Sequence, residues 1–467
     1  MNDFLEFVLN LLDRGISLAI FAVIICAFGV IAAFVIFHLV TKGKKKFPWV
    51  RSILLLIIIG YFAVLSYATL LRYGGGGGYR EMNLHLFRAW REAWNTFFFQ
   101  DWLNIFINIA MFIPLGAILP LMAKLFRRWY VTVPFGFAVS LIIEMIQYFT
   151  GRGIMDVDDI FTNTLGTALG YCIIMIITTA FCKQKKCGLK CFAYSSVPLI
   201  FTVALIGIFG GYHLKEYGNL AETPYFTANT KGIEWQLQFE PDDESKIVPT
   251  YHRKPYNKKT CDEFGEQFAK NLGIVFEDKY YYNSMTVFAN HFGGGFLDVY
   301  YNDGSYSYTA GGAIGQKNAE FSREEVIKML ESFDIYIPDE ADFFIDEYGN
   351  HIFTVDMVFR DGRLYDGELS CKCSENSAVT KIENNLLIFD KYKDVKIISE
   401  SEAYKKLKAG KFSGNDFLER YDIEEIIVKS IALDYMADTK GFYQPVYVFE
   451  LQFNETCDID AAVPAMK

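Results

Sequence analysis

The residues Trp129–Thr150, WYVTVPFGFAVSLIIEMIQYFT, decide the fold that we predict for the first half of this chain. The stretch is apolar and long enough to cross a bilayer, which takes about 20 residues, although Glu144 interrupts it. Five further apolar stretches surround it with only short connections. They are Ile16–Val40, Ser52–Leu71, Trp102–Ala123, Ile160–Cys182 and Phe192–Tyr212. The sequence therefore predicts a polytopic α-helical membrane bundle with six spans over residues 1–212.

The charge balance changes where the last apolar stretch ends. Residues 1–212 carry 18 Lys and Arg against 10 Asp and Glu, whereas residues 213–467 carry 27 against 45. The whole chain is 52% hydrophobic with a net charge of −10, a composition that excludes an intrinsically disordered protein. Because the basic residues are dispersed between apolar runs, we expect no nucleic-acid partner.

Lysines and arginines concentrate in the loops that follow the first, third and fifth apolar stretches. Cytoplasmic loops of membrane proteins carry an excess of these residues. We therefore predict a multi-pass plasma-membrane protein with these three loops inside the cell. Both termini, and with them the acidic residues 213–467, are then extracytoplasmic. The loop before the third stretch is a mild exception, because it holds Arg72, Arg80, Arg88 and Arg91.

Polar side chains recur at a similar depth inside three of the apolar stretches. Such groups are costly in hydrocarbon and by default face a bundle interior or a cavity. At about 1.5 Å of rise per residue, Asn108 and Glu144 lie roughly 9 Å from the outer ends of their stretches. The turn Gly151–Asp159 adds carboxylates and an arginine above them. We therefore predict a polar pocket open to the outer leaflet. The candidate pocket residues are Arg72, Asn104, Asn108, Glu144, Gln147, Arg152, Asp156, Asp158, Asp159 and Asn163.

Several of these candidates have a second interpretation. A carboxylate as deep as Glu144 is either paired with a cation or protonated, and we favour pairing with Arg152 or Arg72. Asp158 and Asp159 could instead cap the fifth span, because carboxylates accept the free N–H groups of a helix start. In the same span, the small residues Gly166 and Gly170 predict a close approach between helices.

Three ordered motifs in this half resemble the VanZ-like membrane family. These motifs are Asn-Ile-Ala-Met-Phe-Ile-Pro-Leu-Gly from Asn108, Ser-Leu-Ile-Ile-Glu-Met-Ile-Gln from Ser140, and the Asp156–Gly170 run with Asp158, Asp159, Asn163 and Gly166. The segment Thr-Leu-Leu-Arg, which ends at Arg72, is also similar to the family pattern. The resemblance covers roughly residues 50–180. It implies a bacterial plasma-membrane protein. Through the founding member of the family, it also implies a link to resistance against teicoplanin, a lipid-tailed glycopeptide.

From His213 the pattern changes to short alternating runs and turns. Asn302-Asp303-Gly304 predicts a hairpin between Phe296–Tyr301 and Ser305–Thr309, and Ser322 with Glu325 predicts a helix start. The other predicted elements are helices at Ser322–Phe333 and Ser401–Lys408 and strands at Asp342–Ile345, His351–Phe359, Ile423–Asp434 and Gln444–Phe453. We therefore predict an extracytoplasmic α+β domain with an antiparallel sheet and two subrepeats, 213–395 and 396–467. Its ending, Tyr-Gln-Pro-Val-Tyr-Val-Phe from Tyr443, is similar to exported modules of the PepSY and YycI kind, which assigns no activity.

The histidines and cysteines of the exported half form no known catalytic arrangement. His252, His291 and His351 are isolated, without metal-ligand spacing between them, so we favour a core or solvated role for each. Cys371 and Cys373 are too close in sequence for an easy unstrained bridge. One disulfide from Cys261 or Cys457 remains open, because four cysteines allow three pairings.

Three functions follow from these observations. In the first, which we favour, the outer-leaflet pocket binds an amphiphile, such as a lipid-linked wall precursor or a lipoglycopeptide. Phe87, Trp90 and Trp94 would then meet the apolar part of the ligand. This function needs no cofactor and no catalysis, and its partner is the lipid bilayer.

The two alternatives place the activity elsewhere. A membrane hydrolase or transferase acting on lipid headgroups would hold Mg²⁺ on Asp156, Asp158 and Asp159, together with Glu144. A ligand sensor or scaffold would use the exported domain, with the spans as its anchor. The substitution Glu144→Gln separates this last function from the other two, because only an anchor should tolerate it.

Overall fold

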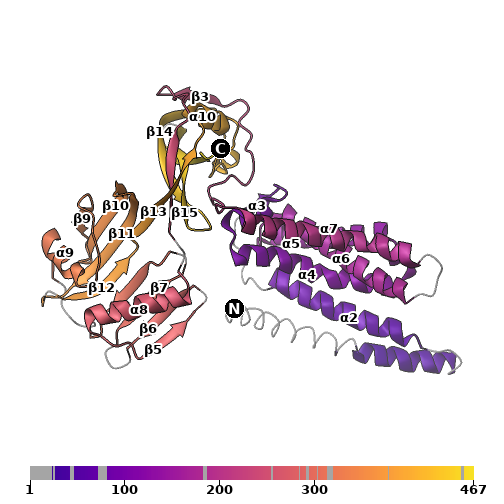
Figure 1. The fold of residues 1–467 in the computed structure, drawn as a ribbon. Helices are drawn as coiled ribbons and strands as arrows, with labels where there is room; N and C mark the ends of the chain where they lie inside the picture. Colours follow the sequence, from indigo (N-terminus) through magenta and orange to yellow (C-terminus); the bar gives the residue numbers. More distant parts are fainter. Residues whose placement is uncertain are drawn as a thin grey trace. The chain divides into compact units, whose positions relative to one another are not determined.

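The computed structural model describes residues 24, 27–42, 47–71, 81–181, 187–253, 256–282, 284–290, 294–301, 303–312, 319–376, 378–453 and 457–467. The chain divides into two compact units, Met1–Glu216 and Tyr217–Lys467. In Figure 1 the first unit runs from indigo to magenta and the second from magenta through orange to yellow.

Five helices of the first unit are long and apolar enough to cross a membrane. They are α2 (Trp49–Ser66), which continues into the π-helical turn η1 (Tyr67–Leu71), α4 (Phe99–Met122), α5 (Trp129–Thr150), α6 (Val157–Ala180) and α7 (Cys187–Leu214). These helices occupy the second to sixth predicted spans. A shorter apolar helix, Ala27–Thr41, overlaps the first predicted span, Ile16–Val40. Most of the remainder of that span lies outside the described residues, so a count of six is not confirmed.

Helix α6 packs against α4, α5 and α7. Its contact with α4 depends on glycine. A Cβ on Gly166 would lie 2.1 Å from the backbone oxygen of Ile109, and a Cβ on Gly170 would lie 2.0 Å from that of Ile113. No side chain fits at either position, so the predicted close approach of helices is confirmed.

The connection from α2 to α4 returns to the start of α6. The two-residue strand β1 (Met82–Asn83) pairs in parallel with β2 (Met155–Asp156), which leads directly into α6. The short helix α3 (Arg88–Thr96) follows β1 and precedes α4. We call the end of the bundle that holds β1, β2 and α3 the loop end.

The second unit is built on a largely antiparallel sheet of 14 strands. In chain order its elements are β3 (Glu234–Leu237), β4 (Ile247–His252), α8 (Lys258–Leu272), β5 (Asp278–Tyr281), β6 (Met285–Ala289), β7 (Phe296–Tyr300), β8 (Tyr306–Thr309), α9 (Arg323–Glu331), β9 (Asp342–Ile345), β10 (His351–Arg360), β11 (Arg363–Cys373), β12 (Val379–Asn384), β13 (Leu387–Lys396), α10 (Glu400–Lys408), α11 (Phe417–Arg420), β14 (Glu425–Ala437), β15 (Phe442–Phe453) and β16 (Cys457–Pro464). The hairpin β7–β8 and the capping box of Ser322 on α9 are confirmed.

Two large hydrophobic cores, and a smaller one around Tyr251, Phe389 and Tyr443, stabilise this unit. Phe268 from α8, Leu330 from α9 and Leu369 from β11 belong to the first core. Leu407 from α10 and Phe449 from β15 belong to the second. Helices α8 and α9 therefore share one core with the sheet, and α10 packs on another part of it (Figure 1).

The four cysteines of the second unit, Cys261, Cys371, Cys373 and Cys457, are all free. The disulfide from Cys261 or Cys457 that the sequence left open is therefore not formed. Cys261 is fully buried in the first core, where its Sγ lies 3.9 Å from the carbonyl oxygen of Val299. Cys457 is exposed at the start of β16, on the strand that borders the second core.

Candidate functional site

Polar side chains of α4, α5 and α6 meet near the loop end. The Asn108 side chain on α4 donates a hydrogen bond from Nδ2 to Oδ1 of Asp159 on α6. Asn163, one turn further along α6, donates from Nδ2 to Oγ of Ser140 on α5 at 2.9 Å. Asn163 is only 4% exposed, and its Oδ1 is buried without a partner. The three helices thus share one buried polar cluster, which the glycine contacts between α4 and α6 hold in register.

Glu144 belongs to this cluster and is 2% exposed, so its side chain is buried among protein atoms. Its Oε2 accepts a hydrogen bond from the backbone N–H of Asp156 at 2.9 Å. The predicted pairing with Arg152 is wrong, because the Nη1 of Arg152 donates instead to the carbonyl oxygen of Leu70 at 3.1 Å. The other proposed partner, Arg72, lies outside the described residues.

Asp156 and Asp158 organise the loop end. Asp156 is the N-cap of α6, since its Oδ1 accepts the N–H of Asp158 at 2.7 Å, and its Oδ2 accepts Nδ2 of Asn83 at 3.0 Å. Asp158 is 1% exposed and accepts the backbone N–H groups of Phe87 and Ala89, the latter at 2.7 Å. The predicted capping of α6 by Asp158 or Asp159 is therefore wrong. Asp158 instead binds the start of α3, where free N–H groups also need acceptors.

Of two other candidates, Gln147 contacts the segment that follows α2, whereas Asn104 lies apart from the cluster. Gln147 on α5 donates from Nε2 to the carbonyl oxygen of Thr69 in η1 at 2.9 Å. Asn104 is exposed on α4, where its Oδ1 accepts Nε2 of Gln100 at 3.1 Å. The structure thus brings together five of the candidates in the buried cluster. These five are Asn108, Glu144, Asp156, Asp159 and Asn163.

An apolar groove of about 400 Å³ lies beside this cluster. Residues of the α3 start, α6 and α7 form its lining, and all of them are aromatic or aliphatic. They are Phe87, Trp90, Phe161, Leu165, Val197, Ile200, Phe201, Ala204, Leu205 and Ile208. Of the three aromatic residues predicted to meet an apolar ligand, Phe87 and Trp90 line the groove. Trp94 packs instead against Tyr212, with ring centroids 6.1 Å apart.

The buried carboxylate of Asp158 connects the polar cluster to this groove. Phe87, whose N–H binds Asp158, has a φ of 69° and packs edge-on against Phe161 with ring centroids 5.1 Å apart. The indole Nε1 of Trp90 is buried without a hydrogen-bond partner. The groove wall is therefore apolar and is held in place by Asp158.

Among the described residues, one group of three potential metal ligands has donor atoms all within 4.8 Å of one another. It consists of His351, Cys371 and Cys373. His351 on β10 lies directly opposite Cys371 on β11, and all three side chains are buried. The Nε2 of His351 accepts the N–H of Phe321 at 3.0 Å. The ring proton of a neutral imidazole is then on Nδ1, where a metal ion would have to displace it.

Sequence reasoning missed this group because it compared histidines only with histidines. The signal that could have found it is Cys-x-Cys, since residues two apart on a strand lie on one face of the sheet. Of the two roles that we favoured for His351, core or solvated, its complete burial agrees with the core role.

Comparison with known proteins gives one family match. Residues 47–178 match the family model described as VanZ/LLP1, over nearly the same region as the resemblance in the sequence. No curated protein matches the chain significantly.

Two solved structures show weak similarity. An uncharacterized protein from Eubacterium rectale ATCC 33656 is 14% identical, covers 50% of this chain and 86% of its own, and has a TM-score of 0.29. The Bacillus megaterium YpeB C-terminal domain is 12% identical, covers 46% of this chain and 95% of its own, and has a TM-score of 0.19. Neither score supports an argument about the fold of the second unit. The apolar helices and the family match together show a multi-pass membrane protein that is VanZ-like over residues 47–178.

Proposed function

We propose that the membrane unit binds an amphiphile and thereby contributes to tolerance of teicoplanin-type glycopeptides. The alkyl tail of the ligand, which is a lipid-linked wall precursor or the lipid-tailed antibiotic itself, occupies the apolar groove. The observation that carries this proposal is the groove of about 400 Å³, whose lining contains only aromatic and aliphatic residues. Its volume is in the usual range of small-molecule sites.

The polar cluster has a positioning role in this proposal. Asp158 and Glu144 are nearly inaccessible, at 1% and 2% exposure, so they cannot grip a headgroup directly. Asp158 instead holds the start of α3, and α3 supplies Trp90 to the groove.

The proposal requires the loop end to face the cell exterior, where a glycopeptide arrives. The distribution of Lys and Arg supports this orientation, since Lys124, Arg127 and Arg128 lie at the opposite end of α4. Cys457, which is exposed and free, provides a test. A membrane-impermeant maleimide should label the wild type in intact cells more strongly than Cys457→Ser. Equal labelling of the two proteins before lysis, with a difference only after lysis, would contradict the orientation.

Two neighbouring residues of α7 test the groove itself. Ala204 lines the groove, whereas Val203 does not and is 58% exposed. We expect Ala204→Trp to fill the groove and Val203→Trp to leave it open. In a bacterial host lacking the gene, the wild type and Val203→Trp should raise the minimum inhibitory concentration of teicoplanin, and Ala204→Trp should not.

Vancomycin, which has no lipid tail, serves as the control antibiotic, and immunoblots of membranes confirm equal protein levels. The proposal is wrong if Ala204→Trp protects as well as the wild type. It is also wrong if deletion of the gene changes sensitivity to both antibiotics equally.

A further inference from the structure

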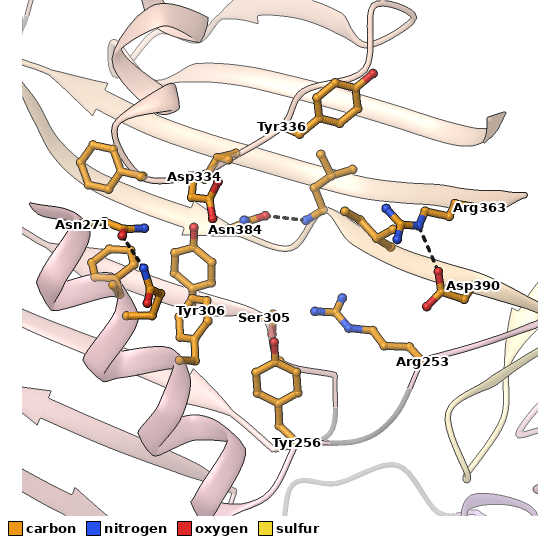
Figure 2. Close-up of a pocket in the computed structure, with 18 residues that line it drawn as sticks. Arg253, Tyr256, Asn271, Ser305, Tyr306, Asp334, Tyr336, Arg363, Asn384 and Asp390 are labelled. Carbon is orange, nitrogen blue, oxygen red and sulfur yellow. Dashed lines mark hydrogen bonds and ion pairs between the residues drawn. The ribbon is translucent and has the colours of Figure 1, made fainter. Parts of the chain in front are cut away.

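The second unit contains a polar cavity of about 450 Å³, which is separate from the membrane groove (Figure 2). Its walls come from α8, from the turn before β8, from the segment after α9, and from β11 to β13. The rings of Phe264, Phe268 and Phe333 contribute an apolar side to the cavity. The cavity therefore combines aromatic walls with charged and amide groups.

Arg253 brings a positive charge to this cavity, which the carboxylate of Asp303 partly offsets without forming an ion pair. Its backbone follows β4, where its N–H donates to the carbonyl oxygen of Gly441 at 2.9 Å. The Nη1 atom is buried without a hydrogen-bond partner, and no described carboxylate forms an ion pair with the guanidinium. The guanidinium carbon lies 5.9 Å from the centroid of the Tyr256 ring.

Burial makes this arrangement costly. It lowers the pKa of the Arg253 guanidinium through desolvation, yet an arginine stays charged at any physiological pH. The neighbouring Arg363 shows the usual solution, because its Nε lies 3.0 Å from Oδ1 of Asp390. A buried guanidinium without such a carboxylate is suited to an anionic group of a ligand.

An acidic group lies elsewhere in the same cavity. Asp334 follows α9 in a left-handed conformation with a φ of 59°, and its side chain is exposed. Figure 2 shows it beside Tyr306 and Asn384, away from Arg253. No ion pair within the described residues holds its carboxylate. Because Arg363 and Asp390 neutralise each other, the cavity presents one cation and one anion at separate places.

We propose that this cavity binds a small zwitterion of the amino-acid or short-peptide class. The carboxylate of the ligand binds Arg253, its ammonium group binds Asp334, and an apolar side chain packs against the phenylalanine rings. A volume of about 450 Å³ is at the small end of known ligand sites. This inference is independent of the proposed membrane function, because it concerns a different unit of the chain.

A series of related probes tests the proposal on the wild-type protein. Isothermal titration calorimetry would compare L-phenylalanine, L-phenylalaninamide, N-acetyl-L-phenylalanine and the dipeptide alanyl-phenylalanine against the full chain in nanodiscs. We expect phenylalanine or the dipeptide to bind. If phenylalanine binds more tightly, the ligand class is a free amino acid; if the dipeptide binds more tightly, it is a short peptide. The amide lacks the carboxylate and the N-acetyl compound lacks the ammonium, so each should bind roughly ten- to a hundred-fold more weakly than phenylalanine.

Two outcomes of this series overturn the proposal. One is an amide that binds as tightly as phenylalanine, because the Arg253 contact would then contribute nothing. The other is the absence of any binding tighter than about 1 mM for all four probes. Neither outcome depends on the stability of a variant.

Substitutions assign the contacts to residues. Arg253→Met should weaken phenylalanine binding roughly ten- to a hundred-fold but leave the binding of the amide unchanged. Asp334→Asn should weaken phenylalanine without changing the N-acetyl compound. The matched control is Arg420→Met, because Arg420 is exposed at the end of α11 and does not line the cavity. Wild-type affinity for phenylalanine in a folded Arg253→Met protein would refute the assignment.

Discussion

Replacing Gly166 by alanine perturbs the contact that brings the polar cluster together. A Cβ at this position would lie 2.1 Å from the backbone oxygen of Ile109, whereas real Cβ contacts are essentially never closer than 3.0 Å. Helices α4 and α6 must therefore separate by about 0.9 Å, and overpacking of this kind costs about 1–3 kcal/mol. The higher helix propensity of alanine returns at most about 1 kcal/mol.

A glycine of α7 provides the matched control. A Cβ on Gly207 would meet no atom within 4 Å, so Gly207→Ala should be neutral or stabilising by up to about 1 kcal/mol. SDS-induced unfolding of the purified chain, followed by tryptophan fluorescence, measures the difference. This signal reports on the first unit, because five of the six tryptophans lie within residues 1–216. Unfolding of Gly166→Ala and Gly207→Ala at the same SDS fraction would refute the packing argument.

Three further predictions follow from the contacts of single side chains. Asp158→Ala removes the acceptor of two backbone N–H groups at the start of α3. Each unsatisfied group costs about 1–3 kcal/mol. Amide hydrogen exchange in α3 should therefore accelerate, while exchange in α7 stays unchanged. Burial raises the pKa of Asp298 above its ordinary value of 3.8. At pH values above 3.8 the charged carboxylate therefore destabilises the folded state. Asp298→Asn should stabilise the second unit at pH 7, and the gain should shrink as the pH falls through the folded-state pKa towards 3.8, as chemical denaturation at several pH values would show. Because Nε2 of His351 already accepts a backbone hydrogen bond, added Zn²⁺ should leave the thermal midpoint unchanged, and a clear rise would identify a metal site instead.

The sequence predicted those elements whose signal is local. The apolar runs that became α4, α5 and α6 carry their own length and hydropathy, and Ser322 with Glu325 marks a helix start without help from distant residues. The sequence also placed Asn108 and Asp159 in one polar region, Asn108 by its depth in its span and Asp159 by its position in the turn above, and the two side chains form a hydrogen bond. These predictions needed no knowledge of long-range pairing.

The capping of α6 needed such knowledge. Asp156 became the cap because β1 pairs with β2, which places Asn83 beside its carboxylate. That pairing joins residues that are far apart in sequence, and neither two-residue strand has a recognisable pattern of its own. The same pairing left Asp158 free to bind the start of α3, a partner that local capping rules do not consider.

Local sequence patterns could not predict either the groove or the polar cavity of the second unit. The groove joins α3, α6 and α7, and only their packing shows that Ala204 lines it while Val203 does not. The structure alone shows that Nη1 of Arg253 is buried without a hydrogen-bond partner. From the sequence we predicted residues that line an amphiphile site, namely Phe87 and Trp90, but not the groove between them.

Direct binding of a lipid-tailed glycopeptide tests the central claim of a tail-binding groove. The measurement compares teicoplanin with its deacylated core on the purified wild type, Ala204→Trp and Val203→Trp in nanodiscs. We predict that teicoplanin binds the wild type and Val203→Trp, that Ala204→Trp weakens this binding at least tenfold, and that the deacylated core binds none of them. Equal binding of teicoplanin to all three proteins, or binding of the core as tight as that of teicoplanin, would contradict the account.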